Sequence, residues 1–184
     1  MKKLFLIAIF RIISICFLFA YLNDIRKDKH PFVFTESDRT FLYQKKEVFL
    51  KYYDLCGSDN DSDSSLVYSA RIGSVSFLFT GDISSDMEKE LLYRYGPMKI
   101  DILKVAHHGS YTSSSRYFIS SILTRFAIIS TSGRYGHPHN IVLSILDDYK
   151  VKYYVTKDDG TITFSFSRFL DFITTGKGEF VIIS

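Results

Sequence analysis

The chain has 184 residues and a formal net charge of +3, so charge alone identifies neither a nucleic-acid-binding protein nor a membrane-surface protein. Its length suits one domain with a buried core. The two cysteines, Cys16 and Cys56, form no CxxC pair, which argues against a disulfide framework and against a thiolate metal site.

An apolar segment follows the charged start of the chain. Residues 4–22 are apolar except for Arg11 and Ser14. The segment is close to the length that spans a bilayer, and no A-x-A cleavage site follows it. Arg11 in mid-span costs about 2.5–3.5 kcal/mol, which makes the span marginal. We therefore predict a hydrophobic N-terminal helix at residues 1–22 that stays attached as a membrane anchor; a helix buried in the protein is the alternative.

Residues 23–64 are predicted to form a linker with short strands at 32–34 and 48–53. The run of Asp, Asn and Ser at 57–65 predicts a loop, because these side chains bond to nearby backbone groups. It lacks the glycine and the final glutamate of an EF-hand loop, so calcium binding is not indicated.

From residue 65 onward, predicted strands alternate with predicted helices, which indicates a layered α/β domain. Ser85 and Glu88 form a predicted capping box at the start of the first helix. Strands are expected at 66–72, 75–80, 100–105, 126–130, 152–156, 161–166 and 180–183, with 152–156 and 161–166 on the two sides of a turn at 157–160. Helices are expected at 85–95, 115–123 and 140–149.

Three successive predicted strands end in residues that suit metal binding. Asp82 follows the first, His107 and His108 follow the second, and the sequence Gly-His-Pro-His with His137 and His139 follows the third. Loops at the carboxyl ends of parallel strands line one crevice, so these side chains are expected to converge there. Carboxylate and imidazole suit zinc, manganese or iron, and a bound metal lowers the pKa of its water to about 7.

Polar residues beside these histidines suit a phosphate group. Ser110 and Thr112 offer hydroxyls, and Arg134 offers a bidentate guanidinium. Each histidine or carboxylate also has an ordinary explanation: Asp82 as a helix cap, His137 as a turn residue and the others as surface residues. Their joint occurrence at three successive strand ends favours a functional site.

The motifs LVYSARIGSVSFLFTGDI, DILKVAHHGSYTSSS, AIIS, RYGHPH and YVTKDDGTI occur in this order between about residues 65 and 166. Together they resemble the C-terminal part of the metallo-β-lactamase-fold domain of the competence DNA-internalisation protein family ComEC. The resemblance implies an αββα sandwich. It also implies a metal-dependent phosphodiesterase that acts on incoming DNA beside a membrane channel.

The resemblance assigns roles to individual residues. Asp82 matches the carboxylate that bridges metals, and His107 matches the late metal ligand, with His108 as the second choice. His137 matches a position that faces the substrate phosphate and takes part in catalysis. His139 is expected to contact substrate beside it.

The chain departs from the family pattern at its first metal site. That site comes largely from an upstream HxHxDH loop, and the only histidine before Asp82 is His30. We therefore expect residues 65–184 to form a partial sandwich, the back half of the fold. Such a domain is expected to hold one zinc or manganese ion at most and to be weak or inactive as a stand-alone chain. A second chain is a possible source of the missing half.

Three functions stay open at this point. The first is a ComEC-like metallo-hydrolase of the phosphodiesterase or nuclease type, linked to DNA uptake across a membrane. The second is a non-catalytic fragment or binding remnant, and the third is a small-molecule metallo-hydrolase of the same superfamily. DNA as a partner rests on the resemblance, because the basic residues are scattered. The domain is expected on the extracytoplasmic side of the membrane.

Overall fold

A computed structural model describes residues 39–43, 46–55, 65–166 and 170–183. The predicted anchor at 1–22, the strand at 32–34 and His30 lie outside the described residues. Among the residues that are described, none of the helices has the length and apolar character needed to cross a bilayer.

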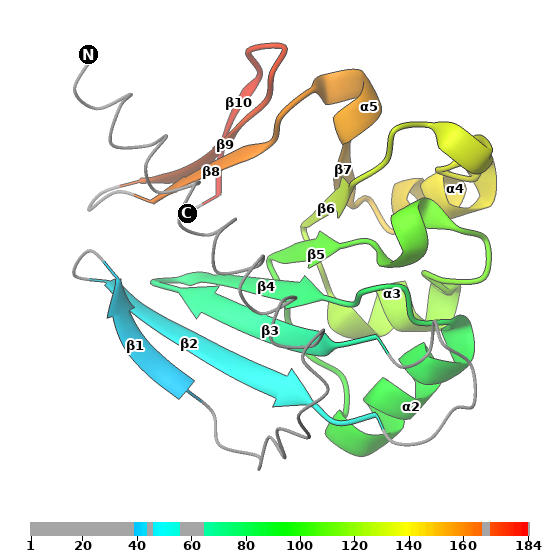
Figure 1. The fold of residues 1–184 in the computed structure, drawn as a ribbon, viewed down its shortest axis with the longest axis horizontal. Coiled ribbons are helices and arrows are strands. Elements are labelled where there is room, and N and C mark those ends of the chain that lie inside the picture. Colours follow the sequence, from blue (N-terminus) through cyan, green and yellow to red (C-terminus); the bar gives the residue numbers. More distant parts are fainter. Residues whose placement is uncertain (1–38, 44–45, 56–64, 167–169, 184) are drawn as a thin grey trace, which may run out of the picture.

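Seven strands form one mixed sheet, and their order in space follows their order in the chain (Figure 1). Neighbours are antiparallel from the first strand to the fourth and parallel from the fourth to the seventh. The strands are β1 (Arg39–Tyr43), β2 (Lys46–Tyr53), β3 (Val67–Ile72), β4 (Val75–Phe79), β5 (Ile102–Lys104), β6 (Phe126–Ile129) and β7 (Lys152–Val155).

Helices connect the parallel strands and cover one face of this sheet (Figure 1). They are α2 (Ser85–Tyr95), α3 (Arg116–Ile122) and α4 (Asn140–Asp148). A second, antiparallel sheet covers part of the other face and consists of β8 (Thr163–Phe166), β9 (Asp171–Thr174) and β10 (Phe180–Ile182). The layers are therefore helix, sheet and sheet.

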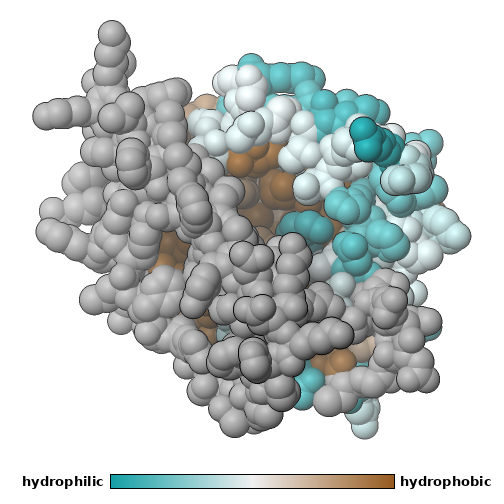
Figure 2. Space-filling model, viewed as in Figure 1, coloured by the Kyte–Doolittle hydropathy of each residue, from teal (hydrophilic) through white to brown (hydrophobic). Residues whose placement is uncertain are grey.

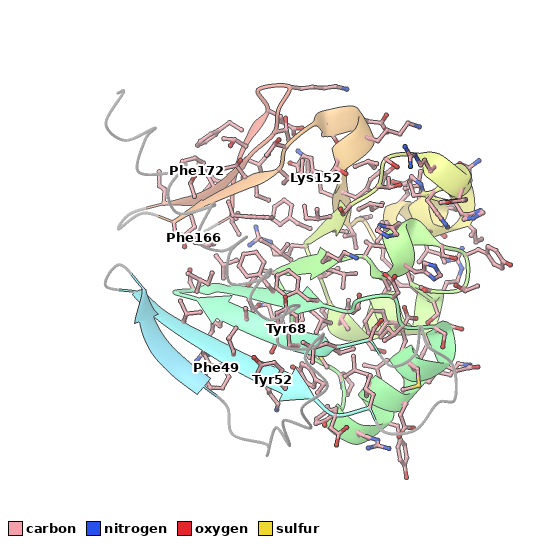
Figure 3. The ribbon with its side chains drawn as sticks, in the orientation of Figure 1. Phe49, Tyr52, Tyr68, Lys152, Phe166 and Phe172 are labelled. Atoms are coloured by element: carbon pink, nitrogen blue, oxygen red, sulfur yellow. The ribbon has the colours of Figure 1, made fainter. Side chains whose placement is uncertain are left out.

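Successive residues of the central strands enter two separate cores, as expected for a sheet that is covered on both faces. Leu78 of β4 and Leu103 of β5 are fully buried against the helices. Phe77, one residue earlier on β4, faces the second sheet and lies 6.0 Å from the ring of Phe166, measured between ring centroids. Figure 3 shows Phe166 between the two sheets. This packing holds the carboxyl ends of β4, β5 and β6 at one edge.

The α/β class is confirmed, and the predicted strands and helices between residues 65 and 156 lie within a few residues of their expected places. The predicted turn at 157–160 differs: it contains a short helix, α5 (Thr156–Asp159), and the strands on its two sides belong to different sheets. Asp159 Oδ2 accepts a hydrogen bond from Val155 N–H at 2.7 Å, which closes this helical turn. A fourth, helical layer of an αββα sandwich is not found within the part of the chain that the structure describes.

The start of α2 also differs from the prediction. Ser84, and not Ser85, is the N-cap, and its Oγ accepts from Met87 N–H at 3.5 Å. Glu88 does not complete a capping box but reaches the start of α3.

Candidate functional site at the carboxyl ends of the parallel strands

The ends of β4 and β5 are joined by hydrogen bonds between their loops. His107 N–H donates to the Gly81 carbonyl at 3.1 Å, and Thr80 Oγ1 donates to the Lys104 carbonyl at 2.9 Å. Asp82 is the residue after Gly81, so it lies at the same corner of the sheet as His107. The two strand ends that were predicted to converge are therefore neighbours.

Lys104 adds a positive charge to this corner. It is half-buried at the end of β5, and burial lowers its pKa while the negative charge of Asp82 opposes this shift. The carboxylate of Asp82 makes no hydrogen bond or ion pair with any other described residue. Lys104 was not among the predicted site residues, although a lysine inside the apolar run 100–105 is a visible signal.

The two histidines after β5 lie in η1 (Ala106–Gly109) and point to different surroundings. Both have left-handed backbone conformations, with φ of 47° at His107 and 55° at His108, which few residues other than glycine adopt. His108 is exposed, and its Nδ1 lies 2.5 Å from the carbonyl of Ser130 at the end of β6. A carbonyl only accepts, so this nitrogen carries the proton. His107 is half-buried and faces the next loop.

Close contact at Gly109 brings the third loop, which includes η2 (Arg134–Gly136), against η1. Gly109 has φ of 86°, and a Cβ placed there would lie 2.6 Å from Pro138 Cβ. Its carbonyl accepts from His139 N–H at 2.9 Å. Only glycine permits this approach, because any side chain would push the two loops apart.

The rings of three predicted site residues form a cluster where these loops meet. The ring centroids of His107 and His137 are 5.9 Å apart, and those of His137 and His139 are 5.0 Å apart. Tyr111, which was not among the predicted site residues, lies edge-on to His139, with 5.2 Å between the ring centroids, and is largely exposed. We call His107, His137, His139 and Tyr111 the histidine cluster.

The pKa of His137 lies below its ordinary value in this cluster, which favours the neutral imidazole. Burial lowers its pKa, and the neighbouring His139 and His107 lower it further. Its Nδ1 is buried, and no group in the described part of the chain makes a hydrogen bond with it. A neutral imidazole has one nitrogen with a free lone pair, which suits a metal ion or a proton donor.

Two other predicted site residues, Ser110 and Arg134, are not part of the histidine cluster. Ser110 is buried and its Oγ lies 2.9 Å from Thr112 Oγ1, so its hydroxyl is already engaged. Arg134 is exposed at the start of η2.

The surface over these strand ends, on the right of Figure 2, is hydrophilic, and apolar surface lies beside it. Among the described residues, no three His, Cys, Asp or Glu side chains converge closely enough to hold a metal ion.

Comparison with known proteins finds relatives among competence proteins, while no family model matches the chain. ComE operon protein 3 of Bacillus subtilis (strain 168) is 36% identical over 109 residues, and Recombination protein 2 of Haemophilus influenzae is 38% identical over 109 residues. Competence protein ComA of Neisseria gonorrhoeae is 30% identical over 112 residues.

These matches cover 58–59% of this chain but only 14–16% of the three relatives. The relationship to competence proteins is confirmed at this level.

Proposed function

We propose that the chain is a ComEC-like metallo-hydrolase domain that acts on the phosphodiester backbone of DNA during uptake, with weak turnover when it stands alone. The observation that carries this proposal is the histidine cluster, in which the His107 N–H bonds to Gly81, the residue before Asp82, in a chain related to competence proteins. The helix–sheet–sheet layering is compatible with a partial metallo-β-lactamase-like sandwich.

The chemistry of the donors fits zinc or manganese. Asp82 offers a carboxylate and His107 a half-buried imidazole, and His137, whose pKa is lowered by burial, offers a second imidazole. When bound, such an ion polarises a phosphoryl oxygen and lowers the pKa of its water. The number of donors does not fit a complete site, because no described group of three converges. We therefore propose one weakly held ion, with a further ligand supplied from elsewhere, for example by a second chain.

The residues of this chain also serve the substrate directly in this proposal. His139 and His137 border the position of the phosphate, and the exposed Arg134 contacts it through its paired N–H groups. Lys104 balances the charge of Asp82, so that a phosphodiester is not repelled.

Hydrolysis of bis(p-nitrophenyl) phosphate with added Mn²⁺ or Zn²⁺ tests the activity. We expect a metal-dependent rate that His107→Ala lowers by about a hundredfold, as removal of a group engaged in the reaction does. Tyr93→Ala, at an exposed position of α2, is the control; His108→Ala is expected to lower the rate less than His107→Ala, because Nδ1 of His108 is engaged by the Ser130 carbonyl. If the hydrolysis rate of the His107→Ala variant equals that of the wild-type chain, the mechanism is rejected.

Calorimetric titration with Zn²⁺ tests the ion separately. We expect weak binding to the full chain and loss of the binding heat in Asp82→Ala. Unchanged heat in this variant would show that the ion lies elsewhere.

A second function, binding without turnover, is favoured by the lack of three converging ligands among the described side chains. Fluorescence anisotropy with a labelled oligonucleotide distinguishes it. Oligonucleotide binding that depends on Arg134 and His139, without hydrolysis in the presence of any added metal ion, would support this alternative. Turnover of small phosphoesters without any affinity for DNA would instead indicate a small-molecule hydrolase.

We also propose that residues 4–22 attach the chain to a membrane and that the domain lies on its extracytoplasmic side. The apolar character of this segment supports the attachment. Resistance to carbonate extraction, and cleavage by protease added outside intact cells, are the expected results. Release by carbonate would contradict the anchor.

A further inference from the structure

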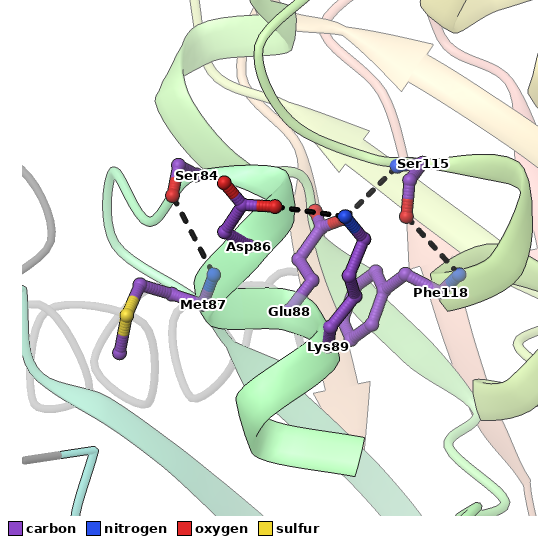
Figure 4. A network of polar contacts seen from close by, with 7 residues as sticks. All are labelled: Ser84, Asp86, Met87, Glu88, Lys89, Ser115 and Phe118. Atoms are coloured by element: carbon purple, nitrogen blue, oxygen red, sulfur yellow. Dashed lines mark hydrogen bonds and ion pairs between the residues drawn. The ribbon is translucent and has the colours of Figure 1, made fainter. Parts of the chain in front are cut away.

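A buried carboxylate on α2 reaches the start of α3. Glu88 has no exposed surface. One of its carboxylate oxygens accepts a hydrogen bond from Ser114 N–H, and the other accepts from Ser115 N–H at 2.9 Å. Figure 4 shows Glu88 beside Ser115, whose own Oγ caps α3 by accepting from Phe118 N–H at 3.2 Å. Glu88 thus satisfies the N–H of the N-cap of α3, which the helix leaves unpaired, and the N–H of the residue before it.

No cation neutralises this carboxylate among the described side chains. Lys89, the nearest lysine in the chain, pairs with Asp86 at 2.8 Å and is exposed (Figure 4). Burial raises the pKa of Glu88 to about 7, although both N–H bonds act to lower it. A buried, unpaired carboxyl is a poor way to stabilise the packing of two helices, because an apolar side chain of similar size would do so at lower cost.

Two further bonds attach the same loop to the start of α2. Ser85 N–H donates to the Thr112 carbonyl at 2.8 Å, and Ser113 Oγ donates to the Ile83 carbonyl at 2.8 Å. Residues 112–115 are therefore held by α2 and the turn before it.

The held loop continues directly into the histidine cluster. Ser113 N–H donates to the Ser110 carbonyl at 3.2 Å, and Ser110 N–H donates to the His107 carbonyl at 2.9 Å. Tyr111, between these residues, contacts His139. A displacement of residues 114 and 115 would therefore reach both His107 and Tyr111 through a short, rigid path.

We propose that Glu88 is a positioning residue for the histidine cluster: its carboxylate fixes the 110–115 loop, and the loop fixes His107 and Tyr111 against His137 and His139. Only the expected effect of Glu88 on phosphodiester hydrolysis rests on the proposed function. The positioning itself is a property of the folded chain.

The test compares Glu88→Gln with Glu90→Gln in the full chain at pH 8, above the pKa of Glu88, so that its carboxylate is charged. Glutamine keeps one acceptor but presents an N–H₂ group where the second acceptor was. Glu90 lies on the same helix and pairs with Arg94 at the surface, so it is the matched control. We expect the Ser114 and Ser115 amides to exchange with solvent at least about tenfold faster in Glu88→Gln, as loss of a hydrogen bond to a charged group implies.

The histidines supply the decisive readout. Imidazole proton resonances of His107 and His139 are expected to shift in Glu88→Gln and to stay in place in Glu90→Gln. Leu91→Ala, at a fully buried position of the same helix, controls for a general loss of stability and is expected to leave these resonances unchanged. Faster amide exchange with unmoved imidazoles would reduce Glu88 to a helix cap and overturn the proposal. An equal shift in Leu91→Ala would overturn it as well.

A second variant covers the case in which Glu88→Gln does not fold. Glu88→Met keeps the length of the side chain and removes both acceptors and the charge, and the same imidazole shift is expected. The readout needs neither metal nor substrate. A wild-type chain that fails to hydrolyse the phosphodiester probe therefore rejects the proposed function, while the imidazole shifts still decide the role of Glu88.

Discussion

The two loops that form the histidine cluster are built in opposite ways. The loop after β5, residues 106–115, is tied to α2 by backbone and side-chain bonds and buries Ser110, Ser113 and Ser114. The loop after β6, residues 130–139, exposes Arg134 and Tyr135 and meets the first loop mainly at Gly109 and through its histidine rings.

The difference indicates that the two loops have different roles in the site. A rigid loop holds one imidazole in a fixed place, whereas a more exposed loop can adjust its arginine and histidines to a ligand. The contact at Gly109 is the point at which the second loop takes its position from the first. Changes in the rigid loop should therefore cost more stability than equivalent changes in the exposed one.

The largest effect is expected where the loops touch. Gly109→Ala combines a side chain at positive φ with a Cβ 2.6 Å from Pro138, and we expect a loss of about 4 kcal/mol in the free energy of unfolding. Gly136→Ala is the control, since its φ of 73° carries strain but nothing lies within 4 Å of the new Cβ. Urea unfolding measures both. Equal losses would show that the loops are not in close contact.

A somewhat smaller effect is expected from pH. The pKa of Glu88 is raised from 4.5 to about 7, so between these values the folded state keeps a proton that the unfolded state releases. Stability should therefore fall as pH rises through this window, by an amount on the order of 3 kcal/mol. Among the charges of the residues that the structure describes, Lys89 acts on Glu88, and its attraction lowers this pKa. Glu88→Gln should lack this slope in urea unfolding, and a slope that persists would assign it to another group.

The smallest expected effect on stability is the difference between substitutions at two serines, one in each loop. Ser113→Ala removes the donor to the buried Ile83 carbonyl, which should cost about 1–2 kcal/mol. Ser132→Ala, on the exposed loop, should change stability by less than about 0.5 kcal/mol. Thermal unfolding of the two variants checks this, and a larger loss for Ser132→Ala would reverse the ranking of the loops.

Periodicity predicted the elements of the parallel half well, because the buried strands are short and apolar and two of the helices that follow them begin at a serine cap. It could not predict that residues 152–156 and 161–166 enter different sheets. Local turn chemistry at 157–160 is the same for a hairpin and for one turn of helix, and only the packing of Phe166 against Phe77 decides between them.

The site was predictable only in part, for a similar reason. Strand ends placed Asp82 and His107 at one corner, and motif order indicated the competence relatives. The pairing of Glu88 with α3 could not be read from its sequence spacing, because the same spacing from Ser85 suits a capping box. The sequence pattern did not mark Lys104 as a site residue because its neighbours are apolar. It did not mark Tyr111 because nothing in the pattern distinguishes it from other exposed tyrosines. Metal binding and the roles of Ser110, His108 and Arg134 stay predictions.

The strict agreement between chain order and strand order in the seven-stranded sheet has a consequence for folding. Each strand pairs with the strand before it in the chain, so every pairing within this sheet closes over only one connection, which limits the loop-closure entropy of each step. The histidine cluster draws on the connections after β5 and after β6, which meet where Pro138 lies against Gly109. The cluster is therefore complete only when both of these strands have joined the sheet.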